Sequence, residues 1–145
     1  MVSSKHFNLG GVEETLKSLS VDRKLSCMLV RDYTSIRIAS LNDSITSFRN
    51  STAEDSLKKR LQSLISDSIE NVKHLEDLLD NVDKASTLGM SDLSILDTVR
   101  LWKRDIALRI VLLNNMSVCD TLDLQRLLFM WLDSPYKHKL PFESN

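Results

Sequence analysis

The apolar residues of this chain recur three and four positions apart over most of its length, which is the spacing of one face of an α-helix. The clearest run contains Leu57, Leu61, Leu64, Ile65, Ile69, Val72, Leu75, Leu78, Leu79 and Val82. Ser51-Thr52-Ala53-Glu54 precedes this run with the spacing of a capping box, and Gly89, which can adopt the left-handed conformation that ends a helix, follows it. The pattern predicts one long helix over about 53–87. At 1.5 Å per residue it would measure about 50 Å, longer than a compact domain of this size usually spans, so a projecting part would need a partner.

Shorter periodic runs predict four more helices, over 12–19, 23–48, about 91–114 and 121–133. Ser20-Val21-Asp22 offers a boundary between the first two, and Ser91 or Ser94 offers a cap for the next. Asp120 or Ser117 is expected to cap the last helix, which Pro135 stops. In the second run, Tyr33 to Ile38 is rich in β-branched residues and alternates apolar with polar, so a strand or a kink is the alternative there.

Turn-forming residues are nearly absent. Glycine occurs only at positions 10, 11 and 89, and proline only at 135 and 141. Sheets of short strands need frequent turns, which usually recruit glycine, proline or Asn-Gly pairs. The sequence therefore predicts an all-α fold, a bundle of four to five helices with one long central helix at about 53–87. We expect the 145 residues to form a single domain, with 1–11 and 136–145 as flexible ends.

Composition and charge exclude several classes of protein. The chain has 42% hydrophobic and 27% charged residues, so it is neither disordered nor fibrous, and its formal charge of -1 gives no general affinity for nucleic acid. The only run of cations, Lys58-Lys59-Arg60, fits a solvated helix surface better than a nucleic-acid site. No apolar run reaches the roughly 18 residues of a membrane span, and the first eleven residues lack the pattern of a signal peptide. We therefore expect an intracellular protein, cytoplasmic or nuclear, with no membrane span.

The residues offer little for catalysis. His74, with Glu70 one turn before and Asp77 one turn after it, is the only cluster with metal-ligating character, and it lacks the paired Glu-x-x-His motifs of di-iron bundles. Cys27 and Cys119 stand far apart with no CxxC motif, which favours two reduced, buried thiols. No phosphate-binding glycine loop fits the glycine positions. We expect no enzyme, no metal and no cofactor.

Two segments, Leu75 to Leu79 and Leu124 to Leu128, match the LxxLL spacing that lets a helix place leucines in a partner's groove. The first fits core periodicity. The second is followed by Phe129, which falls outside the core stripe, and aromatic residues in such positions are typical of contact hot spots. The predicted partner-binding residues are Leu124, Leu127, Leu128, Phe129 and Trp131.

The resulting hypothesis is a non-enzymatic protein–protein interaction module, an adaptor or a small structural subunit of a larger intracellular complex. It would bind through helix faces in the manner of a coiled coil. Its partners would be other proteins, or a second copy of the chain in a homodimer. One alternative is a mature secreted four-helix signalling factor. Three glycosylation patterns, at Asn42, Asn50 and Asn115, and a Cys27–Cys119 bridge would support it. The other alternative is a helical metal-binding protein or enzyme centred on His74.

Overall fold

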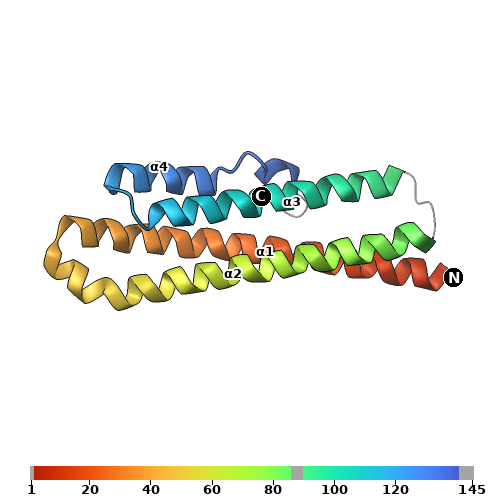
Figure 1. The fold of residues 1–145 in the computed structure, drawn as a ribbon, viewed down its shortest axis with the longest axis horizontal. Helices are drawn as coiled ribbons and strands as arrows, with labels where there is room; N and C mark the ends of the chain where they lie inside the picture. Colours follow the sequence, from red (N-terminus) through yellow and green to blue (C-terminus); the bar gives the residue numbers. More distant parts are fainter. Residues whose placement is uncertain (1, 86–89, 141–145) are drawn as a thin grey trace.

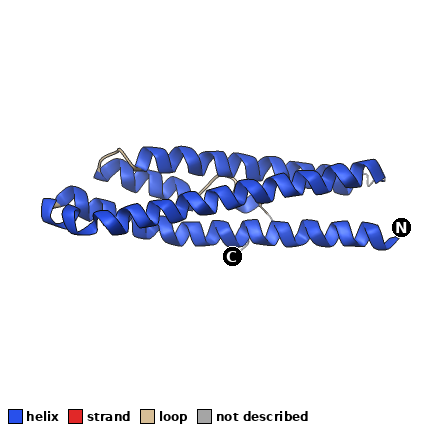
Figure 2. Ribbon diagram, turned by 60° about the horizontal axis from the view of Figure 1, so that its bottom comes forward, coloured by secondary structure: helices blue, strands red, loops and turns tan. Residues whose placement is uncertain are grey.

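The computed structural model describes the backbone of residues 2–85 and 90–140. Four α-helices follow one another, α1 (Val2–Asn42), α2 (Ser44–Ala85), α3 (Met90–Met116) and α4 (Thr121–Leu132), and a short 3-10 helix, η1 (Lys137–Lys139), comes after them. The described residues contain no strand (Figure 2). The predicted all-α fold is confirmed.

The four helices form an elongated up-and-down bundle (Figure 1). The longest pair, α1 and α2, lie side by side as an antiparallel hairpin, and α3 and α4 lie along the same rod (Figure 1). The helix α1 packs beside α2 and α4, and α3 packs beside the same two helices, so α1 and α3 are diagonal neighbours. Because α4 is short, it covers only the half of the bundle that holds the α1–α2 turn (Figure 1).

Heptad-like seams hold the hairpin together. On α2 the buried positions are four and three residues apart, as in a coiled coil: Leu61, Ile65, Ser68, Val72, Leu75 and Leu79. On α1 the facing seam is more polar: Val12, Thr15, Leu19, Arg23, Ser26, Val30 and Tyr33. The hydroxyls of Thr15 and Ser26 donate to the carbonyls of Gly11 and Arg23 at 2.8 and 2.7 Å, so these buried groups are satisfied within their own helix.

This polar seam explains two differences from the sequence prediction. No break occurs at Ser20-Val21-Asp22, because Leu19, Arg23 and Ser26 carry one buried stripe across it, and the two predicted helices 12–19 and 23–48 are one helix. The alternative of a strand or kink over Tyr33 to Ile38 is also wrong, since α1 runs through it. Thr34 stays compatible with the helix because its hydroxyl donates to the Val30 carbonyl at 2.7 Å.

The predicted start of the long helix is wrong as well. The turn of the hairpin is at Asp43, whose carboxylate oxygen Oδ1 accepts from the Ile45 N–H at 2.9 Å, so Asp43 caps α2. The expected capping box lies inside α2, where the Ser51 hydroxyl donates to the Phe48 carbonyl at 3.2 Å and Glu54 pairs with Arg37. In place of one long central helix over 53–87, the bundle has two long helices of 41 and 42 residues.

The later helices agree better with the sequence. The helix α4 spans 121–132 against the predicted 121–133, and Asp120 caps it. The other candidate cap, Ser117, instead donates to the Leu113 carbonyl at 3.0 Å. Gly89, the predicted end of the long helix, lies outside the described residues. Residues 2–11 continue α1, and Leu140 in the C-terminal segment is buried.

Candidate protein-binding surfaces

The helix α4 is fixed at both ends by short-range hydrogen bonds. Asp120 Oδ1 accepts from the Asp123 N–H at 3.0 Å, and the Asp133 N–H donates to the Phe129 carbonyl at 2.8 Å. The acidic Asp123 in the first turn also complements the positive end of the helix dipole. Twelve residues are thereby held as a defined helix against α1 and α3.

The five predicted partner-binding residues divide between the two sides of α4. Leu124 and Trp131 are 0% and 1% exposed and belong to the core. Leu127 and Leu128 are partly buried and pack against that core. Phe129 is 66% exposed and points away from it. In this chain, Phe129 is the residue of the set that is open to a partner.

Two further apolar residues share the outward side with Phe129. Leu122, seven residues earlier and therefore on the same face, is 57% exposed, and Met130 is 46% exposed. The sequence analysis missed both, because it followed the inward leucine stripe. The signal that marks them is that α4 is apolar around most of its circumference, a property typical of helices buried on all sides. We call Leu122, Phe129 and Met130 the outer α4 face.

A second exposed apolar group lies at the turn of the α1–α2 hairpin. Leu41, Ile45 and Phe48 are 47%, 63% and 86% exposed. The hairpin extends beyond the adjacent α3–α4 connection (Figure 1). Arg37, about one and a half turns before the end of α1, marks the level of that connection, since its guanidinium contacts the Cys119 carbonyl at 3.4 Å. The hairpin tip therefore has no helix beside it to cover these side chains.

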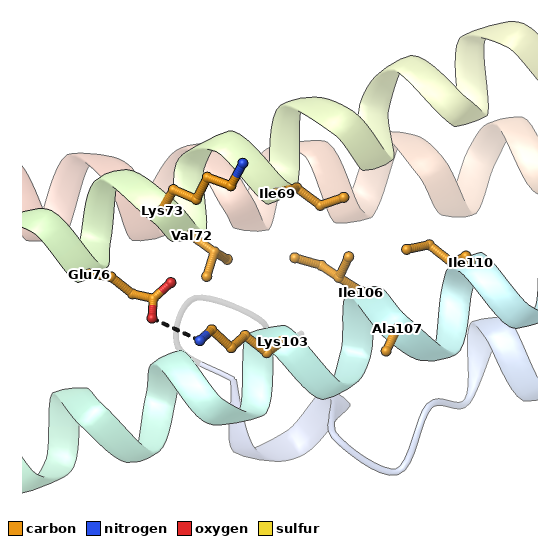
Figure 3. Close-up of a pocket in the computed structure, with 8 residues that line it drawn as sticks. All are labelled: Ile69, Val72, Lys73, Glu76, Lys103, Ile106, Ala107 and Ile110. Atoms are coloured by element: carbon orange, nitrogen blue, oxygen red, sulfur yellow. Dashed lines mark hydrogen bonds and ion pairs between the residues drawn. The ribbon is translucent and has the colours of Figure 1, made fainter.

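A shallow groove of about 370 Å³ runs between α2 and α3. Figure 3 shows Ile69 and Val72 of α2 facing Ile106 and Ile110 of α3 across it. One side is bridged by an ion pair, 2.7 Å between Lys103 Nζ and Glu76 Oε2. The groove is apolar at its floor and charged at its rim, so it can accept an aliphatic side chain.

A buried ionic cluster lies where α1, α3 and the segment after α4 meet. Asp105 Oδ2 is 3.3 Å from Arg23 Nε and 3.0 Å from Arg109 Nε, and Asp105 Oδ1 accepts from the Ser134 hydroxyl at 2.9 Å. All four residues are at most 3% exposed. These contacts attach the segment after α4 to α1 and α3, and so position the outer α4 face.

Burial lowers the pKa of the Arg109 guanidinium from its ordinary value, and the neighbouring charge of Arg23 lowers it further, while Asp105 opposes both effects. Both guanidinium groups approach the carboxylate of Asp105 in a desolvated place.

The other chemical candidates from the sequence do not form a centre. His74 is exposed on α2, and its neighbour Glu70 pairs with Lys73 at 3.6 Å. Across the described side chains, no group of three His, Cys, Asp or Glu is arranged to hold a metal ion. Cys27 and Cys119 form no disulfide, and both are only partly buried. Cys119 lies level with Arg37, ten residues and so about 15 Å along α1 from Cys27, which is too far for a disulfide.

None of the described helices is long and apolar enough to cross a membrane. Comparison with protein-family models, with curated proteins and with solved structures gave no match. The function must therefore be argued from the surfaces themselves.

Proposed function

We propose that this protein is a non-enzymatic protein–protein interaction module, an adaptor or small subunit of a larger complex, that binds its partner through the outer α4 face. The observation that carries the proposal is the apolar character of both sides of α4. Its inner side seals the core through Leu124 and Trp131, while Phe129 is 66% exposed on the opposite side. Aromatic side chains are strongly enriched among residues that dominate binding energy.

The architecture of the bundle supports the same proposal. A 12-residue helix would offer a flexible apolar surface if it were loosely attached, but α4 is capped at Asp120 and anchored beyond its end through Ser134 and Asp105. A rigidly held apolar face loses little conformational entropy on binding. The exposed hairpin tip, with Phe48 at 86% exposure, adds a second apolar surface at the same end of the rod.

Replacement of Phe129 tests the proposal directly. Because Phe129 is exposed, Phe129→Ser should leave the fold intact while weakening partner affinity about tenfold or more. The measurement is affinity purification of the tagged full chain from its native source, with quantitative mass spectrometry of the co-purifying proteins.

A matched control is Val21→Ser on α1, an exposed apolar residue at 62% exposure away from α4. Urea unfolding of each variant checks that the fold is retained. Equal recovery of the same proteins with wild type and with folded Phe129→Ser would contradict the proposal. Light scattering over a range of concentrations shows whether the partner is a second copy of the chain, as in a homodimer. The proposal also includes an intracellular location, cytoplasmic or nuclear.

A further inference from the structure

The outer α4 face continues past Phe129 toward α1. Leu132, three residues after Phe129 and so its neighbour on the helix surface, lines a pocket of about 250 Å³ between α1 and the end of α4. Cys27 and Met28 of α1 line the same pocket, and Met28 is 63% exposed. The apolar surface therefore extends from α4 across this pocket onto α1.

This extended surface follows the axis of the rod, because α4 runs antiparallel to α1 (Figure 1). Leu132 and Met28 lie at the same level, since they line one pocket. From Leu122 to Leu132 the surface is about 15 Å long at 1.5 Å per residue. An apolar strip that runs parallel to two neighbouring helices is the shape that receives one more helix. About three turns of a partner helix would cover it.

Two cations border this surface at its α1 end. Arg31 of α1 is exposed, Lys137 of η1 is partly buried, and both line the pocket. Within the described residues, neither makes an ion pair. The acids nearest to them in sequence, Asp32 and Asp133, are exposed and do not line the pocket. Arg31 and Lys137 are therefore able to pair with acidic groups of a partner.

The other cations along the surface already have partners in this chain. Arg23 lines the pocket but pairs with the buried Asp105 at 3.3 Å, and Lys24, which also lines it, has an interaction of its own. On the outer side of α4, Arg126 lies 3.7 Å from Asp123. The uncompensated positive charge is thus at the α1 end of the surface, beside the apolar pocket.

We propose that the partner of the outer α4 face is an acidic amphipathic helix of another protein. Its apolar side covers Phe129, Leu132 and Met28, and acidic residues on its flank pair with Arg31 and Lys137. Complementary charges at the edge of an apolar interface fix the orientation of the partner and speed association. A second copy fits less well, because a two-fold interface would bring the same cations of both chains together. This inference rests on the proposed function and names the chemistry of the partner.

Photo-crosslinking in the native source tests where the partner lies. A photoreactive phenylalanine analogue replaces Met28 in one full chain and Phe129 in another. We expect both positions to crosslink to the same segment of the same protein, which mass spectrometry of the crosslinked peptides identifies. That segment should have apolar residues three and four apart and more acidic than basic residues.

Charge reversal at the pocket tests the acidic flank. In the chain with the analogue at position 129, Arg31→Glu/Lys137→Glu should lower the yield of the crosslinked species about tenfold or more, because attraction becomes repulsion. The control Lys59→Glu/Arg104→Glu makes the same change of charge at two exposed cations that do not line the pocket, and it should keep most of the yield. Urea unfolding checks that both double variants are folded.

A crosslink from position 129 without one from position 28 would overturn this inference and leave the proposed function standing. The inference is also overturned if the crosslinked segment is not acidic, if it belongs to a second copy of this chain, or if Arg31→Glu/Lys137→Glu leaves the yield unchanged. Crosslinks from neither position in a folded chain would contradict the proposed function as well.

Discussion

Burial and neighbouring charges shift the pKa of individual residues in this protein. Asp22 on α1 is the clearest example outside the ionic cluster. Partial burial raises its pKa above the ordinary value of 3.8, Asp67 adds repulsion that raises it further, and Arg109 opposes both. The folded chain therefore holds a proton on Asp22 more tightly than the unfolded chain does.

A pH dependence with a definite sign follows from this shift. Between the unfolded pKa and the raised folded pKa, the folded state binds more protons, so the contribution of Asp22 to stability falls as pH rises through that window. Above the folded pKa, the charged carboxylate of Asp22 lowers the stability of the folded state. We expect Asp22→Asn to be more stable than wild type at pH 7, and this gain to disappear below about pH 3.8.

Urea unfolding of wild type and Asp22→Asn at a series of pH values measures the difference. Glu13→Gln is the matched control, because its carboxylate is 60% exposed on the same helix. If Asp22→Asn is more stable than wild type by the same amount at every pH, or is less stable at pH 7, the charge of Asp22 is not the cause of the stability difference.

At the scale of the helices, periodicity predicted the elements well and their boundaries poorly. Local signals predicted the span of α4 to within one residue and offered Asp120 as one of two caps. Periodicity failed between Ser20 and Asp22, where buried Arg23 and Ser26 continue the stripe with polar residues. A polar residue in a sequence pattern is assigned to solvent, and only tertiary packing shows that it is buried.

The candidate site was predictable in part for the same reason. Phe129 was found as an apolar residue off the core stripe, whereas Leu122 and Met130 were not. On α3, the inward face holds Asp105 and Arg109 at i and i+4 between apolar neighbours. The partners that stabilise this pair, Arg23 and Ser134, are distant in sequence, so no local pattern could reveal the cluster.

The start of α2 gives a test at the scale of the element. Asp43→Ala removes the side chain that accepts from the Ile45 N–H and should cost about 1 kcal/mol of unfolding free energy. Ser51→Ala lies in the helix interior and should be neutral or stabilising by a few tenths of a kcal/mol. Urea denaturation measures the free energy of unfolding of the two variants. A larger loss for Ser51→Ala than for Asp43→Ala would show that the helix begins at the capping box and not at Asp43.

As a whole molecule, the protein is a rod whose length is set by the α1–α2 hairpin. The 42 residues of α2 span about 63 Å at 1.5 Å per residue. Such a shape has a large surface for its volume, and several of the exposed apolar residues in the described part of the chain lie on α4 and at the hairpin tip. Helix-face binding along a rod is the arrangement that the proposed function requires.

Small-angle X-ray scattering tests the shape. A rod of this length has a radius of gyration of about 19–20 Å, while a compact chain of 145 residues has one of about 15 Å. We expect the larger value at a scattering mass of 16.5 kDa. A value near 15 Å at that mass would mean that the hairpin folds back on itself.

The outer α4 face is the central claim, and site-specific photo-crosslinking in the native source tests it most directly. A photoreactive phenylalanine analogue replaces Phe129 in one chain and the exposed Gln62 of α2 in another. We predict a discrete crosslinked protein species from position 129 that is absent from position 62. Crosslinks from position 62 alone, or from neither position in a folded chain, would contradict the claim that this protein binds its partner through α4.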